Sequence, residues 1–211
     1  MSSITNLDRR LYLDVNSFAR HTSFAHAFMR EFALYGGVVL LAILLLVAYF
    51  RARKGDDPKK TVDTVLWAGA GTLIALGLNQ PLSHLVGRVR PYNAIRGVEV
   101  LVPRANDFTF PSDHATVAGA VIVGLLLADL PTGLVATALG LFLAFARVYV
   151  GAHYPGDVIG GLIFGGLIVI VLRPIGMAII SRITDLIARS PLKILIFHKT
   201  KAPDSGVGTA A

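Results

Sequence analysis

Residues 38–47 read VVLLAILLLV, ten consecutive apolar residues inside the longer apolar stretch 32–50. A bilayer core is about 30 Å thick, and a helix that crosses it needs roughly 20 mostly apolar residues. Four further stretches meet or approach this length: 65–86, 115–130, 133–150 and 158–180. The sequence therefore predicts an all-α integral membrane protein, built as a bundle of five transmembrane helices.

The composition of the 211-residue chain agrees with this fold class. Hydrophobic residues make up 54% and charged residues 16%, and the mean hydropathy is +0.65. A water-soluble domain carries about 25% charged residues, and a disordered chain has far less apolar surface. Cysteine is absent, which excludes disulfides, thiol nucleophiles and thiolate metal sites. We expect one domain over 1–198 and a small, polar, disordered tail over 199–211.

The segment 4–30 differs from the five stretches because its apolar residues recur at helical spacing. They are Ile4, Leu7, Leu11, Val15 and Phe18. This pattern predicts an amphipathic helix that lies in the membrane interface. An ordinary capping helix has the same pattern, and both interpretations stay open.

Basic residues predict the orientation in the membrane. Lys and Arg cluster in the loop 51–63 and in the tail from 182 onward, and four predicted spans separate the two segments. Such clusters favour the cytoplasm, and an even number of spans allows both to be there. The N-terminal helix and the segments 87–112 and 151–157 are then outside. Much of the net charge of +7 is this topology signal, so no nucleic-acid partner is predicted.

Three polar segments fall near the predicted outer face. They read GRVRPY at 87–92, FPSDH at 110–114 and ARVYVGAHYPGD at 146–157. Their arginines oppose the general trend of basic residues toward the cytoplasm. A charged residue kept at such a position is a candidate for function, and here the function indicated is anion binding.

The second segment has the features of a helix N-terminus. Ser112 follows a proline and precedes the third apolar stretch, so we expect it to be the N-cap. The backbone amides of Asp113 and His114 would then point out of a helix end that favours anions. Pro155 predicts a second helix N-terminus at the same membrane level.

The third segment supplies a candidate nucleophile. His153 and Asp157 are four residues apart and can share one helix face. A carboxylate bonded to one imidazole nitrogen leaves the other unprotonated and oriented for attack. Arg90 and Arg147 offer forked donors that match phosphate oxygens.

Each residue alone has a simpler explanation. An isolated Arg88 or Arg90 would extend to lipid headgroups. Asp113 and Asp157 could form half of a metal site, but no dense carboxylate cluster accompanies them, so no metal is predicted. Glycines at 160, 161, 165 and 166 are interpreted as plain helix packing. The convergence of arginines, histidines, a serine and an aspartate is hard to explain by packing.

The three segments together resemble the signature of the type-2 phosphatidic acid phosphatase family. Its pattern runs Lys-x6-Arg-Pro, then Pro-Ser-Gly-His, then Ser-Arg-x5-His-x3-Asp. Here Arg90 and Pro91 match the end of the first part and residues 111–114 match the second. The third part is matched in spacing by Arg147, His153 and Asp157. The resemblance covers residues 79–166 by motif.

The chain departs from the family pattern at three positions. Ser83 stands at the Lys position, Asp113 at the Gly position and Ala146 at the Ser position. Arg88 is a candidate replacement for the missing cation. The PSDH version and the later VGAHYPGD look most like the bacitracin-resistance subgroup, whose members are undecaprenyl-diphosphate phosphatases.

The resemblance implies a mechanism. His153 would attack the terminal phosphorus and form a phosphohistidine, and Asp157 would orient it. His114 would protonate the leaving oxygen and later activate water. The phosphate oxygens would be held by Arg90, Arg147, Ser112 and the amide of Asp113, with Arg88 as a further candidate.

The implied substrate is a polyprenyl diphosphate at the outer leaflet of a bacterial cytoplasmic membrane, and no metal or other cofactor is implied. A phosphatase of phosphatidylglycerophosphate, phosphatidate or another lipid phosphate is an alternative. A non-catalytic lipid-binding or transport protein is an alternative of another class. No particular oligomeric state is predicted.

Overall fold

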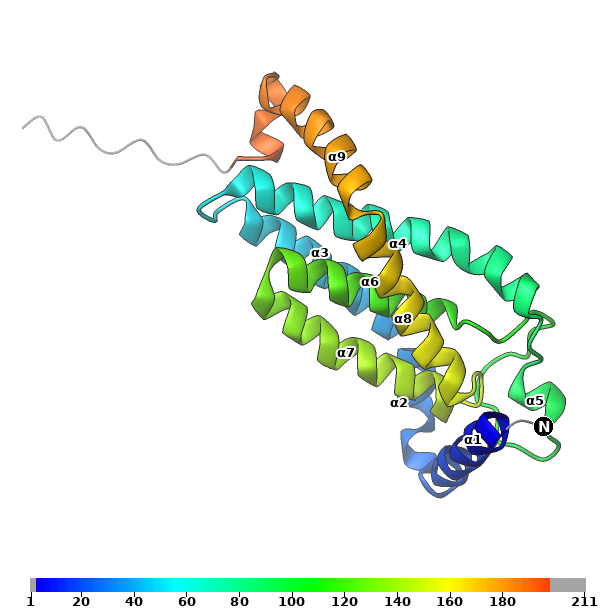
Figure 1. Cartoon of the computed structure of the whole chain (residues 1–211). Coiled ribbons are helices and arrows are strands. Elements are labelled where there is room, and N and C mark those ends of the chain that lie inside the picture. Colours follow the sequence, from blue (N-terminus) through cyan, green and yellow to red (C-terminus); the bar gives the residue numbers. More distant parts are fainter. Residues whose placement is uncertain (1–2, 198–211) are drawn as a thin grey trace, which may run out of the picture.

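The computed structural model describes residues 3–197 of the chain, and every regular element in that range is a helix (Figure 1). Five helices form the bundle: α3 (Gly37–Ala52), α4 (Pro58–Val86), α6 (Asp113–Ala128), α7 (Leu130–Tyr149) and α8 (Pro155–Val171). A sixth helix, α9 (Arg173–Ala188), continues from α8. The prediction of an all-α fold is confirmed.

The other elements, of which α1 is the longest, lie toward the two ends of the bundle. They are α1 (Ser3–His21), η1 (Ser23–Ala25), α2 (His26–Glu31), the π-helical η2 (Phe32–Gly36), α5 (Pro91–Ala94) and η3 (Pro191–Leu195). The predicted tail 199–211 lies outside the described residues.

Several of the helices are long and apolar enough to cross a membrane. Three helical segments meet the requirement alone: Ser23–Ala52, Pro58–Ala94 and Leu130–Tyr149. The bent pair of α8 and α9 makes a fourth span if it counts as one, and α6 is a shorter apolar helix of 16 residues. The number of five spans therefore stays a prediction.

Helix α6 lies at the centre of the bundle and packs against α3, α4, α7 and α8. Two glycines of α8 permit the closest of these contacts. A Cβ atom on Gly165 would collide with the backbone oxygen of Thr116, and one on Gly161 would lie 2.7 Å from the backbone oxygen of Ser112. Small residues that let backbones approach are a general device of membrane helices.

The apolar stretch 158–180 is not the single helix that its hydropathy predicts. Helix α8 ends at Val171, α9 begins at Arg173, and the two helices meet at an angle of 58°. Pro174 stands in the first turn of α9, where it has no N–H to continue the hydrogen bonds of α8. The sequence is mostly apolar on both sides of the break, so hydropathy does not reveal it. Pro174 is the local sequence feature that does.

Helix α1 lies across one end of the bundle (Figure 1). It ends at His21, earlier than the predicted segment 4–30, because Thr22 leaves helical geometry. Its predicted apolar face is turned outward: Leu7 is 59% exposed and Phe18 54% exposed. A different face packs on the protein, formed by Asp8, Tyr12, Asn16 and Ala19.

The two ends of the bundle carry different segments. The loop between α3 and α4 lies beside the C-terminal segment, where Arg53 donates to the carbonyl of Ile194. The segments between α4 and α6 and between α7 and α8 lie at the other end, beside α1 (Figure 1). The two basic segments therefore lie at the same end of the bundle, as the prediction that both face the cytoplasm requires.

Candidate active site

The site is built where α6 and α8 begin side by side. Ser112 is the N-cap of α6, and its side chain accepts from the amide of Ala115 at 3.5 Å. The amide of Ser112 donates to the carbonyl of Asp157 in the first turn of α8 at 3.1 Å. The predicted N-cap is confirmed, and so is the predicted pair of helix N-termini at one level.

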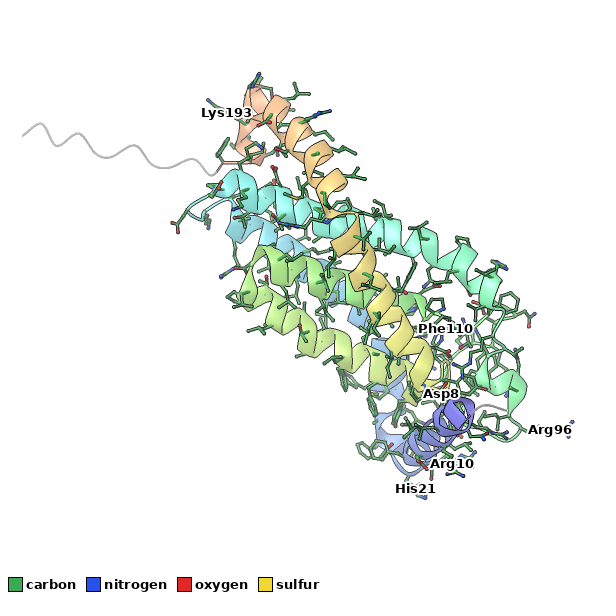
Figure 2. The ribbon with its side chains drawn as sticks, in the orientation of Figure 1. Asp8, Arg10, His21, Arg96, Phe110 and Lys193 are labelled. Atoms are coloured by element: carbon green, nitrogen blue, oxygen red, sulfur yellow. The ribbon has the colours of Figure 1, made fainter. Side chains whose placement is uncertain are left out.

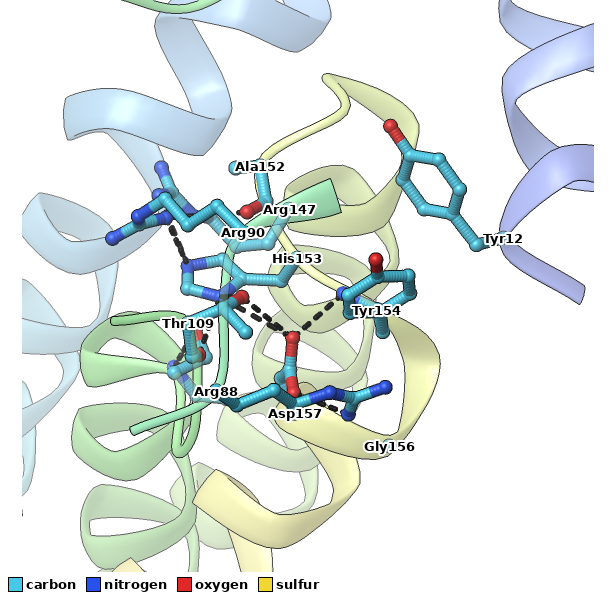
Figure 3. A network of polar contacts seen from close by, with 12 residues as sticks. Tyr12, Arg88, Arg90, Thr109, Arg147, Ala152, His153, Tyr154, Gly156 and Asp157 are labelled. Carbon is cyan, nitrogen blue, oxygen red and sulfur yellow. Dashed lines mark hydrogen bonds and ion pairs between the residues drawn. The ribbon is translucent and has the colours of Figure 1, made fainter. Parts of the chain in front are cut away.

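His153 is buried in the short segment before α8, with 2% of its surface exposed. Its Nδ1 atom lies 2.9 Å from the carbonyl oxygen of Thr109 (Figure 3). A carbonyl can only accept, so these partners assign the proton to Nδ1 and the lone pair to Nε2. That Nε2 lies 3.4 Å from a guanidinium nitrogen of Arg90 and 3.4 Å from one of Arg147.

The surroundings of His153 favour the neutral imidazole. Burial lowers its pKa well below the usual value, and the positive charges of Arg147 and Arg90 lower it further. A neutral ring whose Nε2 lone pair faces two arginines can act as a nucleophile toward an anion bound between them.

The structure differs from the prediction in how Asp157 acts on His153. Its Oδ2 atom lies 3.9 Å from Nδ1 of His153, too far for a hydrogen bond. The hydroxyl of Thr109 lies between them and donates to Oδ2 at 2.6 Å, and it is 3.1 Å from Nδ1. The amide of Tyr154 donates to the same oxygen at 2.8 Å. Any orienting effect of Asp157 therefore passes through Thr109.

Thr109 was missed by sequence reasoning. It stands immediately before the FPSDH segment, but the group that contacts the imidazole most closely is its backbone carbonyl. A carbonyl is common to all residue types and gives no sequence signal.

The two arginines are held in different ways. Arg147 is 6% exposed and donates to the carbonyl of Ala33 at 3.1 Å, while its buried Nε has no hydrogen-bond partner among the described residues. Arg90 donates to the carbonyl of Ala152 at 3.1 Å and holds Asp107 with two bonds of 2.6 and 2.8 Å. Hydrogen bonding from Arg90 lowers the pKa of Asp107.

Arg88 makes contacts that its charge alone did not predict. It is a candidate replacement for the missing cation of the family pattern, and in the structure it donates to Oδ1 of Asp157 at 2.6 Å and to Asp8 of α1. Its guanidinium also lies 4.1 Å from the ring centroid of Tyr154. The side chain is therefore engaged on the opposite side of Asp157 from His153. Asp8 was another residue that the sequence did not single out.

A small polar cavity of about 30 Å³ lies beside His153, and His114 is not among its lining residues. Asp113 and Ser83 line it, and Gln80 donates to both carboxylate oxygens of Asp113 at 3.3 Å. His114 follows in the first turn of α6, with its Nε2 at 3.3 Å from the carbonyl of Leu34. Within residues 3–197, no group of three or more His, Asp or Glu side chains has the arrangement of a metal site.

A phosphoryl group between the two arginines would lie against Nε2 of His153, at the end of an apolar helical bundle. That arrangement suits a membrane lipid phosphatase. The comparison with known families agrees: the model of the PAP2 superfamily matches residues 64–180, more than half of the chain. The chain belongs to the PAP2 superfamily and is a phosphatase, which confirms the resemblance drawn from the motifs.

Two curated proteins illustrate the range of relatives. Undecaprenyl-diphosphatase BcrC of Bacillus subtilis is 29% identical over 160 residues, which cover 74% of this chain and 78% of that protein. A lipid A 1-phosphatase of Rhizobium etli is 32% identical over 63% of each chain. This chain therefore spans just under two thirds of the second relative.

The fold has a counterpart among solved structures. A transmembrane PAP2-type phosphatidylglycerolphosphate phosphatase from Bacillus subtilis superposes with a TM-score of 0.60 at 21% identity, covering 85% of this chain and 89% of that one. At this identity the likeness concerns the fold alone.

Proposed function

We propose that this phosphatase hydrolyses a polyprenyl diphosphate of the undecaprenyl type to its monophosphate, through a phosphohistidine on His153. The observation that carries the mechanism is the setting of His153: its Nδ1 is fixed on the carbonyl of Thr109 and its Nε2 faces Arg90 and Arg147. Support for the substrate comes from the similarity to BcrC, whose name gives it as an undecaprenyl-diphosphatase.

In the first half-reaction, Nε2 of His153 attacks the terminal phosphorus. A P–N bond forms, and the P–O bond to the lipid phosphate breaks. His114 donates a proton to the leaving oxygen. Arg90 and Arg147 stabilise the charge on the transferring group, which is a large effect in a site closed to water. The unpartnered Nε of Arg147 is a donor available to that group.

In the second half-reaction, water attacks the phosphorus and His114 accepts its proton. The P–N bond breaks, which releases inorganic phosphate and restores His153. One positioned acid–base group can serve both steps. In the free protein, Nε2 of His114 contacts the carbonyl of Leu34 at 3.3 Å, so proton transfer from this atom must replace that contact.

An apolar groove beside His114 supports a lipid substrate. It has a volume of about 370 Å³, and Asp113 and His114 lie among its lining residues. The rest of its lining is Leu34, Tyr35, Val38, Val39, Leu76 and Val117. A chain in this groove would keep its apolar surface out of water while its phosphate reaches the polar end.

We also propose that the site faces the outside of a bacterial cytoplasmic membrane, with α1 in the interface and the C-terminus in the cytoplasm. The two basic segments share the opposite end of the bundle, and positive residues favour the cytoplasm. Exposed Leu7, Leu11 and Phe18 on α1 would contact lipid.

The substrate is tested by phosphate release from undecaprenyl diphosphate, phosphatidate and phosphatidylglycerophosphate with the purified protein. We expect the highest kcat/KM for undecaprenyl diphosphate. A higher value for either phospholipid would replace the polyprenyl proposal by a phospholipid phosphatase activity, such as the one for which the solved relative is named.

The nucleophile is tested by trapping an acid-labile phosphoenzyme from a terminally labelled substrate. His153→Ala should abolish both turnover and trapping. His114→Ala removes the leaving-group acid, which typically contributes 10²–10⁴-fold, and should leave trapping detectable with a better leaving group. Near-normal turnover of a folded His153→Ala protein, eluting as one detergent-solubilised peak, would refute the mechanism.

A further inference from the structure

Four polar or aromatic side chains on α1 recur at intervals of four residues and contact the segments around the site. Tyr12 donates to the carbonyl of Gly151 at 3.4 Å, and Asn16 exchanges two hydrogen bonds with the backbone of Glu99 at 2.8 and 2.9 Å. Arg20 donates to the carbonyl of Gly97. Asp8 is the fourth member, and of the four it alone hydrogen-bonds to a residue, Arg88, whose side chain is bonded to Asp157.

Asp8 is buried, with 9% of its surface exposed, and each carboxylate oxygen has its own partner. Oδ1 accepts from the amide of Gly156 in the first turn of α8 at 2.7 Å, and Oδ2 accepts from Arg88. Figure 2 shows Asp8 on the side of α1 toward α8, whereas Arg10 and His21 lie on the side away from the bundle.

Arg88 extends this contact toward the nucleophile. One arm of its guanidinium binds Asp8, and the other binds Oδ1 of Asp157 at 2.6 Å. The other oxygen of Asp157 is bonded by the hydroxyl of Thr109, which lies 3.1 Å from Nδ1 of His153 (Figure 3). The hydrogen-bonded path therefore runs from α1 to the imidazole without interruption.

The guanidinium of Arg88 is also fixed from the side. It lies over the ring of Tyr154 at 4.1 Å, and the ring of Tyr12 packs on Tyr154 with centroids 5.3 Å apart. With two carboxylates and one aromatic face, Arg88 has a defined position. Without the negative charge of Asp8, the second arm of the Arg88 guanidinium loses its ion pair, and hydrogen bonds between ionised groups are among the strongest in proteins.

We propose that Asp8 is a positioning residue of the phosphatase: it holds Arg88 against Asp157 and thereby fixes the carboxylate that, through Thr109, orients His153. The proposal rests on the proposed function of His153 as nucleophile. It assigns to the N-terminal helix a part in catalysis that the motifs of the family do not include.

The test compares three single substitutions on α1 in the purified full-length protein. Asp8→Asn keeps the size of the side chain and an acceptor for Gly156, but it removes the charge and replaces the oxygen that accepts from Arg88 with an NH2 donor. Asn16→Ala loosens the same face of α1 without touching the path, and Asp14→Asn removes an exposed carboxylate of the same helix. Undecaprenyl diphosphate, phosphatidate and phosphatidylglycerophosphate are assayed in detergent micelles, with thermal unfolding measured in parallel.

We expect Asp8→Asn to lower kcat about tenfold with little change in KM, because the path positions the nucleophile and does not touch the substrate. Asp14→Asn should match the wild type. Asn16→Ala should lower the unfolding temperature at least as much as Asp8→Asn but keep kcat within about twofold, since the path stays intact.

A second measurement distinguishes an effect of Asp8 on the orientation of His153 from a general loss of packing around α1. If Asp8 acts through Thr109, Asp8→Asn should reduce kcat less in a Thr109→Val background than in the wild type. Equal effects in both backgrounds, or equal losses of kcat in Asp8→Asn and Asn16→Ala, would overturn the proposal.

The remaining outcomes are also decisive. If neither Asp8→Asn nor the smaller Asp8→Ser elutes as a single peak, Asp8 is a structural residue and the proposal is rejected. If the wild-type protein releases phosphate from none of the three lipids, the proposed function fails, which is distinct from an active wild type with an equally active Asp8→Asn.

Discussion

Replacing Thr109 by valine isolates the contribution of one buried hydroxyl. Thr109 is completely buried, and its hydroxyl donates to Oδ2 of Asp157 at 2.6 Å. Valine has nearly the same shape but places a methyl group where the hydroxyl stood. The backbone carbonyl, which holds Nδ1 of His153 at 2.9 Å, is unchanged. The substitution therefore separates the hydroxyl from the carbonyl of the same residue.

The magnitude follows from the partners that remain. A hydrogen bond to a charged group contributes about 1.5–3 kcal/mol, and the carboxylate keeps its bonds to Arg88 and the amide of Tyr154. We expect the free energy of unfolding to fall by about 1.5–3 kcal/mol. As His153 attacks, positive charge develops on its ring and the influence of Asp157 matters most. If the transition state loses about 1.4 kcal/mol of stabilisation, kcat falls about tenfold.

The assay is phosphate release at saturating substrate, with Thr109→Ser as the matched control. Serine keeps the hydroxyl and should retain kcat within about threefold of the wild type, and KM should be unchanged in both variants. A Thr109→Val protein that folds and turns over at the wild-type rate would show that Asp157 does not act on the imidazole through this hydroxyl.

Three other outcomes are expected. Activity should survive EDTA, because His153 and the arginines supply the nucleophile and the charge; loss on chelation with recovery in Mg²⁺ would contradict this. Any loss of phosphoenzyme formation caused by protonation of His153 should be centred well below pH 6.5, since burial and the two arginines lower the pKa of the imidazole; a decline centred at 6.5 or above would argue against it. A cysteine introduced at Asn106 should react with an impermeant thiol reagent in intact cells and one at Asp56 should not, and the reverse labelling would invert the proposed topology.

Short-range spacing predicted much of the site. Ser112 as N-cap and Pro155 at the start of α8 follow from local backbone chemistry, which needs no knowledge of distant residues. His153 and Asp157 do approach each other to 3.9 Å, but His153 stands before the start of α8, so the two do not share a helix face as the spacing predicted. The four-residue spacing could not predict that the two side chains do not bond directly. Thr109, whose hydroxyl lies between them, comes from a segment 44 residues earlier in the chain.

Long-range pairing was beyond the sequence. Charge alone made Arg88 a candidate for phosphate, but which anion it binds depends on which carboxylates the fold brings to it. Its partners, Asp157 and Asp8, are 69 and 80 residues away. The apolar face of α1 was ambiguous for a related reason. Its spacing does not say whether protein or a bilayer covers Leu7 and Leu11, and the structure leaves both side chains exposed, as an interfacial helix requires.

The glycine contacts between α6 and α8 have a consequence for how the site tolerates change. His114 stands in the first turn of α6 and His153 two residues before α8, so the gap between the two helices determines how far apart the histidines lie. That gap is bounded by backbone atoms: a methyl group on Gly119 would meet the backbone of Leu162, and one on Gly165 the backbone of Thr116. Backbone cannot change rotamer to make room. One added carbon atom at either glycine would therefore push the two helices apart and move His114, the proposed proton donor, away from His153, the proposed nucleophile.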